Sequence, residues 1–191
     1  MKKSIWILLI LTMLVTTMVA CDRRSVETPA PPMETGDQQQ GKDSAVVDPA
    51  PKEETKNIIL YYVNKEYVVT GNEALDKVVP VEKEITMGKE PLESIIMAEL
   101  QKDPEDDKLE TAIGSLKILS VDVAENIAYV NISSEKLNGG SLQETLVLSQ
   151  IVYSLTELPE VEAVQFFVDG GKRETLMGHF TIEEPLKRKE I

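Results

Sequence analysis

The sequence predicts an α+β domain of two layers, in which two helices pack on one face of a mainly antiparallel sheet. Three observations lead to this fold class. Short stretches rich in β-branched and aromatic residues, which are typical of strands, recur through residues 57–191. Two longer segments, 90–100 and 141–155, instead repeat apolar side chains at helical spacing. Hairpin connections between the strands leave both helices on the same side of the sheet.

Three strands are expected to open the domain. Residues 57–63 are β-branched and aromatic, residues 67–70 follow a turn at 64–66 as the second arm of a hairpin, and Val78–Thr86 alternates apolar and polar side chains. Pro80 marks the third strand as an edge or irregular strand, because proline has no N–H to give to a neighbouring strand. We expect self-association or pairing with a partner at this edge, where unpaired backbone groups can accept another strand.

Both helices have recognisable ends. The first opens at Pro91, where the missing N–H does no harm in a first turn, and ends before Pro104. The second begins after a pair of glycines and is followed by Pro159. Ser141 and Glu144 have the spacing of a capping box, in which each side chain binds the backbone amide of the other residue.

Two further hairpins complete the expected sheet. Residues 116–133 alternate apolar and polar side chains on both sides of a turn at residues 125–126. Residues 163–168 form a strand, which a turn at 169–171 connects to a last arm at 172–176. The predicted order is therefore strands, helix, hairpin, helix and hairpin.

The composition excludes several classes of protein. The chain has 191 residues, is 42% hydrophobic and 28% charged, and is therefore typical of a soluble globular protein. Its 20 basic and 33 acidic residues give a net charge of −13, which argues against a nucleic-acid partner because phosphate binding depends on clustered Lys and Arg. With one Cys and one His, the chain cannot supply the four ligands of a zinc finger.

No motif indicates catalysis, a cofactor or a metal site. Any Ser–His–Asp scheme would have to use His179, the only histidine, which we interpret as a structural or surface residue. The acidic segment 105–110 lacks the spaced ligands and the turn glycine of a calcium loop. The Asp-Gly-Gly-Lys sequence at 169–172 lacks the spacing of a phosphate loop and is interpreted as a hairpin turn.

Residues 1–20 predict a bacterial lipoprotein signal peptide. A basic start at Lys2 and Lys3 precedes an apolar stretch at 5–15, and the segment ends at the only cysteine, Cys21. This junction resembles a lipobox, in which the cysteine receives a diacylglyceryl group that anchors the protein on the outer face of the cytoplasmic membrane. The alternatives are an ordinary signal peptide with an incidental cysteine and a retained N-terminal anchor.

Residues 21–56 are predicted to form a disordered linker that carries the lipid-anchored Cys21. This segment holds five of the ten prolines together with Gln, Gly and scattered charges, and it has no apolar periodicity. A flexible chain of this length spans roughly 30–35 Å, which is enough to lift residues 57–191 away from the bilayer.

Four stretches of the domain resemble the GerMN domain of bacterial sporulation and spore-germination lipoproteins. The resemblance spans roughly residues 58–187, and the stretches that carry it are 91–100, 118–133, 150–159 and 164–179. It implies a fold similar to ring-building motifs, which pack edge to face in envelope-spanning complexes. It implies no catalytic residues and no cofactor.

Two functional hypotheses follow. The first is a non-catalytic envelope lipoprotein that scaffolds or stabilises a multiprotein assembly in sporulation or germination, with envelope proteins or further copies of itself as partners. The alternative is a protein that binds or hydrolyses peptidoglycan. In that case Tyr61, Tyr62 and Tyr67 would stack on sugar rings, and acids such as Asp169 or Glu183 would act on the glycan.

Overall fold

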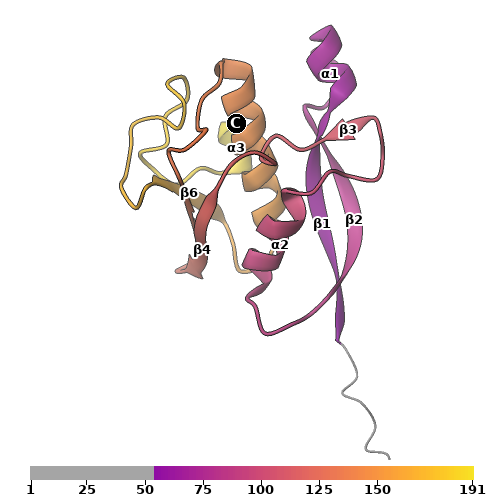
Figure 1. Ribbon diagram of the computed structural model, residues 1–191, viewed down its shortest axis with the longest axis vertical. Helices are drawn as coiled ribbons and strands as arrows, with labels where there is room; N and C mark the ends of the chain where they lie inside the picture. Colours follow the sequence, from indigo (N-terminus) through magenta and orange to yellow (C-terminus); the bar gives the residue numbers. More distant parts are fainter. Residues whose placement is uncertain (1–53) are drawn as a thin grey trace, which may run out of the picture. The chain divides into compact units, whose positions relative to one another are not determined.

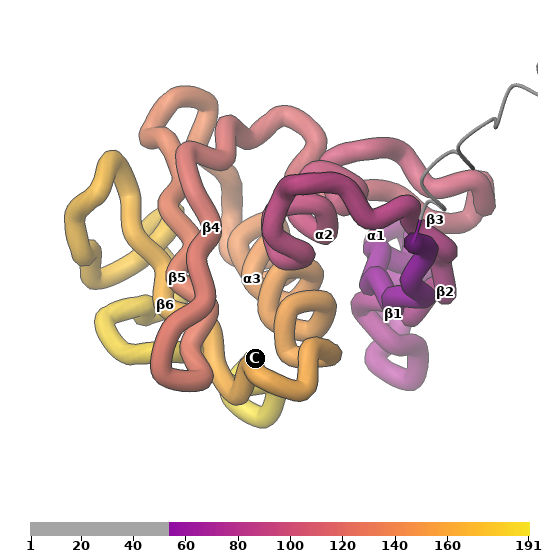
Figure 2. Tube along the Cα trace, turned by 90° about the horizontal axis from the view of Figure 1, so that it is seen from below, coloured from indigo at the N-terminus to yellow at the C-terminus, as the bar shows by residue number. Residues whose placement is uncertain are grey.

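Six strands form two three-stranded sheets, and the two longer helices lie between them (Figures 1 and 2). The computed structural model describes residues 54–191, so the signal peptide, Cys21 and nearly all of the expected linker lie outside the described residues. In chain order the elements are β1 (Thr55–Asn64), α1 (Lys65–Thr70), β2 (Val78–Thr86), α2 (Leu92–Leu100), β3 (Leu109–Glu110), β4 (Ile118–Ala124), β5 (Ile127–Ile132), α3 (Ser141–Leu155), β6 (Ala163–Val168) and a 3-10 turn, η1 (Arg188–Glu190).

The first sheet has β1 at its centre. β2 pairs antiparallel with β1 along nearly its whole length, from Thr55 opposite Thr86 to Val63 opposite Val78. The short β3 takes the opposite edge of β1 and pairs only with the last two residues of that strand. The predicted strands at 57–63 and Val78–Thr86 are confirmed, and the first of them begins two residues earlier than expected, at Thr55.

The second sheet and the helices confirm the predicted α+β class. β4 and β5 form an antiparallel hairpin, whose turn residues Glu125 and Asn126 have φ angles of 52° and 62°. β6 then pairs with β5 in parallel, which requires the crossover that α3 provides. α2 contacts β4 and α3 contacts β6, so both helices cover one face of this sheet as the sequence predicted.

The strands are divided between two sheets, whereas the sequence suggested one. The same helices that cover the second sheet also contact β1, so the first sheet lies on their other side (Figure 2). β1 cannot join β4 because β2 occupies one of its edges and β3 and α3 occupy parts of the other. Alternation in a sequence identifies strands, but it does not identify which strands pair.

One hydrophobic core connects the two sheets through the helices. The fully buried side chains Leu60 of β1, Ile96 of α2, Ile151 of α3 and Phe166 of β6 all belong to it. Each is 0–1% exposed. Burial of a large apolar side chain contributes about 1.5–3 kcal/mol, so the layered arrangement depends mainly on this core.

The predicted hairpin arm at 67–70 is wrong, because this segment belongs to helix α1. The side chain of Asn64 accepts a hydrogen bond from the Glu66 amide at 3.0 Å and caps the start of the helix. Gly71, with φ of 63°, ends it in the left-handed conformation that glycine adopts without strain. These two caps outweigh the β propensity of the short Tyr-Val-Val sequence between them.

The predicted last hairpin is also wrong. After β6 only Gly171 pairs with Val168, and residues 172–176 then leave the sheet. The outer edge of β6 is covered instead by the C-terminal segment. Val164 and Leu186 exchange two backbone hydrogen bonds of 2.9 and 2.8 Å. A distant segment has therefore replaced the expected local partner.

Candidate interaction surface

The residues that the sequence offered for catalysis are not brought together. Within residues 54–191, no group of three or more His, Asp or Glu side chains is placed to hold a metal ion. His179 is exposed, and its backbone amide donates to Glu144 at 2.8 Å, which gives this residue a structural role. Asp169 organises a turn by accepting the Ser134 amide at 3.0 Å, whereas Glu183 is exposed on the C-terminal segment. Neither carboxylate lines the hollows described below.

Hydrogen bonds explain the acidity of Asp169. The Ser134 side chain and amide lower the pKa of this carboxyl, and the nearby Arg173 guanidinium, at 3.9 Å, adds to the effect. A carboxylate held in this way is ionised and committed to the turn. Its lowered pKa makes it unsuited to act as a general acid, which needs a raised pKa.

Two of the three tyrosines proposed to stack on sugars are part of the packing. The Tyr62 hydroxyl donates to the carbonyl of Glu99 at 3.1 Å, and burial together with the charges of Glu99 and Asp103 raises its pKa to about 12. Tyr61 contacts Tyr153 edge to face with 5.3 Å between ring centroids. Tyr67 lies on α1, so the three rings do not form one platform.

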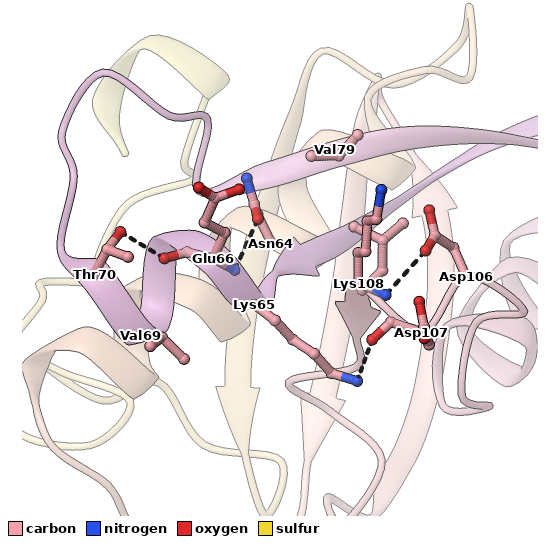
Figure 3. A pocket seen from close by; sticks show the side chains of 10 residues that line it. Asn64, Lys65, Glu66, Val69, Thr70, Val79, Asp106, Asp107 and Lys108 are labelled. Atoms are coloured by element: carbon pink, nitrogen blue, oxygen red, sulfur yellow. Dashed lines mark hydrogen bonds between the residues drawn. The ribbon is translucent and has the colours of Figure 1, made fainter.

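A hollow of about 600 Å³ lies between α1, the start of β2 and the loop at 106–109. Figure 3 shows α1 and the loop facing each other, with Val79 on the strand between them. The Lys65 ammonium donates to the carbonyl of Asp107 at 2.8 Å and connects the two sides. On α1, Val69 lines this hollow and is 83% exposed, so its apolar side chain is open to solvent.

A second hollow of about 240 Å³ lies on the other side of the same loop, against β2. The two hollows share Asp106 and Leu109. Val81 and Leu109 give the second hollow an apolar lining, while Asp103 and Glu105 join Asp106 around it. Apolar area bordered by charge is the usual anatomy of a protein-binding surface.

The second hollow is acidic, whereas in the first hollow Lys65 and Lys108 offset two of the three carboxylates. Lys83 lies beside the second hollow, and its ammonium is 2.7 Å from the Glu99 carboxylate, which Lys102 also contacts. This cluster therefore keeps one positive charge against the four carboxylates that line the hollow. Burial is the main cause of the raised pKa of Tyr62, and the nearby carboxylates of Glu99 and Asp103 add to it because they disfavour a further anion. The acids that line the two hollows are Glu66, Glu82, Asp103, Glu105, Asp106 and Asp107.

The outer edge of β2 borders this acidic surface and pairs with no strand of the described domain. The backbone N–H of Asn64 donates to the carbonyl of Lys77 at 3.0 Å, and the backbone N–H of Met87 donates to the carbonyl of Glu54 at 2.7 Å. These two bonds show which residue pairs of the β1–β2 ladder are hydrogen-bonded. Tyr61, opposite Pro80, instead donates its amide to the Ser154 hydroxyl, away from β2. Backbone groups in antiparallel strands alternate in direction, so Pro80 and every second residue after it face outward on β2.

The outward-facing residues of this edge explain why proline is tolerated there. Pro80 lacks only an N–H that would point away from β1, so no ladder bond is lost. Glu82, Glu84 and Thr86 each present a free N–H and C=O on the same edge, and their side chains are exposed. Val78–Thr86 is therefore the edge strand that the sequence predicted. Its pairing with a partner remains a prediction.

Sequence reasoning missed the role of Glu144. The predicted capping box is wrong: Gly140 is the N-cap and makes no side-chain bond, while Glu144 is completely buried. Its carboxylate accepts the amides of Leu176 at 3.0 Å, Met177 at 2.8 Å and His179 at 2.8 Å. The signal was present in the sequence, since Glu144 falls on the apolar face of α3 in register with Leu148, Ile151 and Leu155.

Comparison with known proteins identifies the family. Residues 59–174 match the family model described as "Germane: Sporulation and spore germination", which covers α1, β2 and the acidic loop. The chain belongs to this family. The resemblance to GerMN domains drawn from the sequence is thereby confirmed. No curated protein sequence matches the chain.

Solved structures of GerMN domains share the fold. The tandem GerMN domains of the sporulation protein GerM from Bacillus subtilis match with 25% identity and a TM-score of 0.54, over 70% of this chain and 45% of that chain. The first GerMN domain of the same protein matches with 16% identity and a TM-score of 0.53, over 70% of this chain and 98% of that chain. This chain thus spans less than half of the tandem structure.

A further match is named "Putative Lipoprotein from Clostridium perfringens", with 24% identity and a TM-score of 0.48, over 71% of this chain and 89% of that chain. Among the helices of residues 54–191, none is long and apolar enough to cross a bilayer.

Proposed function

We propose that this GerMN protein is a non-catalytic, lipid-anchored lipoprotein that scaffolds or stabilises a multiprotein assembly of the cell envelope during sporulation or germination. The observation that carries the proposal is the family match over residues 59–174. The acidic, partly apolar hollow against β2, beside an open strand edge, supports it, because such a surface suits contact with another protein.

The membrane attachment in this proposal depends on Cys21. Cys21 would become the mature N-terminus, and a diacylglyceryl group on it would hold the protein on the outer face of the cytoplasmic membrane. Two acyl chains are needed for stable attachment, since each buried CH₂ contributes about 0.8 kcal/mol. The proline-rich stretch that follows Cys21 in the sequence would let the domain reach partners above the bilayer.

Deletion of the gene tests the role, and Cys21→Ser tests the anchor. We expect the deletion to lower the yield of heat-resistant spores or their germination, and to reduce recovery of an envelope complex from sporulating cells. Cys21→Ser should release the protein from the membrane fraction and reproduce the deletion. Unchanged spore yield, germination and complex recovery would contradict the proposal.

A binding and turnover assay tests the peptidoglycan alternative. Purified full-length protein is incubated with isolated peptidoglycan, and both sedimentation with the glycan and release of soluble fragments are measured. We expect neither. Binding or turnover that is lost in Asp169→Asn or Glu183→Gln would replace the scaffold proposal with the glycan one.

A further inference from the structure

We propose that the outer edge of β2, together with the adjoining acidic hollow, binds an extended, Lys- or Arg-rich segment of a partner protein by strand addition. This inference rests on the proposed function and names the chemistry of the partner. It begins from the backbone. Glu82, Glu84 and Thr86 direct free N–H and C=O groups outward, and no strand of residues 54–191 pairs with them.

Charge decides which strand fits this edge. A strand laid beside β2 places every second side chain directly opposite Glu82 and Glu84, whose side chains are exposed. Its other side chains face the 240 Å³ hollow, which has an apolar lining at Val81 and Leu109 and carboxylates at Asp103 and Asp106. Lys83 balances only part of this charge, because Lys83 and Lys102 share the Glu99 carboxylate and together leave one positive charge against four carboxylates. The complementary partner alternates basic and small apolar residues.

A second copy of this chain fits the edge poorly. Two β2 strands paired with each other would bring the Glu82 and Glu84 carboxylates of both copies into one small area, and like charges opposite each other are destabilising. Pro80 also removes one of the donors that a symmetric pair would use. Proline and charge on an edge strand protect it against copies of itself, and the same acids attract a basic strand.

A metal ion also fits the site poorly. The carboxylates near β2 are spread along a strand and a loop. Within residues 54–191, no three His, Asp or Glu side chains come close enough together to hold an ion. The exposed backbone groups and the apolar lining would have no role in binding a cation, whereas both have a role in binding a peptide.

The test measures binding of a fluorescein-labelled peptide, Lys-Val-Lys-Val-Lys-Val, to the full-length protein by fluorescence anisotropy at low salt. Two matched peptides are run beside it: one with Glu in place of Lys, and one with N-methyl groups on alternate amides, which keeps the charge but prevents strand pairing. We expect only the first peptide to bind, and its affinity to fall as salt rises.

Charge-reversal variants locate the binding. Glu82→Lys with Glu84→Lys should weaken binding by about tenfold or more, because two attractions become repulsions. The matched control, Glu183→Lys with Glu184→Lys, makes the same change in net charge on the exposed C-terminal segment and should change the affinity by less than about twofold. An equal loss in both variants would mean general attraction to an acidic protein and would overturn the proposal.

Substitutions of Glu84 separate backbone pairing from charge. Glu84→Gln keeps the outward N–H, whereas Glu84→Pro removes it without breaking a bond to β1. We expect the proline variant to bind several-fold more weakly than the glutamine variant, with both retaining the wild-type circular dichroism spectrum. Equal affinities would overturn strand addition.

Two other outcomes would also overturn the inference. One is the absence of any peptide binding by the wild-type protein. The other is a dimer of the full-length protein in sedimentation equilibrium that Glu84→Pro dissociates, which would make a second copy the occupant of the edge. Either result leaves the proposed envelope role standing if the gene deletion still impairs spores, so the two failures are distinguishable.

Discussion

Two of the four outer strands, β2 and β6, differ in whether their outer edges are covered. β6 is buried at five of its six residues, and its outer edge is closed by backbone bonds between Val164 and Leu186. β2 is buried at only two of its nine residues, and its outer edge is open. An apolar strand would aggregate if its edge were bare, whereas a strand with Pro80 and two exposed glutamates tolerates an open edge. The open edge is thus compatible with a specific, charged partner.

The largest expected effect on stability is in β6, the strand whose outer edge is covered. Phe166→Ala in β6 removes a fully buried ring and should lower the free energy of unfolding by about 3–5 kcal/mol. Val81→Ala in β2 removes two carbons from a half-buried side chain and should cost about 1 kcal/mol. Urea unfolding of both variants checks the comparison. Similar losses would mean that β2 is as much part of the core as β6.

The next effect concerns the loop that leads to the closed edge. Glu144→Gln removes the charge that holds the amides of Leu176, Met177 and His179, and should cost about 1–3 kcal/mol. Hydrogen exchange should accelerate at these three amides. Glu174→Gln, an exposed acid on the same loop, is the control and should change neither quantity. Unchanged hydrogen exchange in Glu144→Gln would show that the Glu144 carboxylate does not help to hold the segment that closes the edge of β6.

A smaller effect on stability depends on pH and concerns two ion-paired carboxylates, Glu99 and Glu157. Burial alone would raise the pKa of Glu99 and of Glu157, but hydrogen bonds from Lys102 and Lys83 lower the first, and those from Arg188 and Tyr61 lower the second.

A lowered folded-state pKa stabilises the protein above the ordinary glutamate pKa, and this stability is lost as pH falls through the folded value. Stability should therefore decline below about pH 4.3. The contribution of each group is about 1 kcal/mol or less. In Glu99→Gln the decline measured by urea unfolding should be shallower. A pH profile identical to that of the wild type would mean that the ion pairs of Glu99 do not contribute to the pH dependence of stability.

The smallest effect is expected at the open edge itself. Pro80→Thr restores an outward N–H that has no partner in the domain, so the free energy of unfolding should change by less than about 0.5 kcal/mol. Sedimentation velocity should still show no additional self-association, because the glutamates remain. New dimers in Pro80→Thr would show that the proline, and not the charge, keeps the edge free.

The sequence predicted local elements well and long-range contacts poorly. The strands at Val78–Thr86 and 163–168 and the two long helices follow from periodicity, which depends on neighbouring residues. The helix at Lys65–Thr70 was mistaken for a strand because a two-sided cap overrode the β propensity of three residues. The parallel pairing of β6 with β5 and the cover of β6 by Leu186 depend on residues far apart in the chain, and no local pattern encodes them.

The candidate surface shows the same division. Pro80 marked an edge strand from sequence alone, and the acidic loop at 105–110 was visible as a run of charge. Their meeting at shared hollows could not be predicted, because it depends on β3 returning to pair with the end of β1. Glu144 was assigned to a local cap, although its partners lie 32 to 35 residues further along the chain.

The closure of β6 also fixes an order of events during synthesis. Val168 completes the strand, but Leu186, which covers its edge, emerges eighteen residues later, close to the C-terminal Ile191. Until then the edge of an apolar strand has no partner. Chains that stall or are cut between these points should therefore be sensitive to aggregation and proteolysis, even though they contain all six strands.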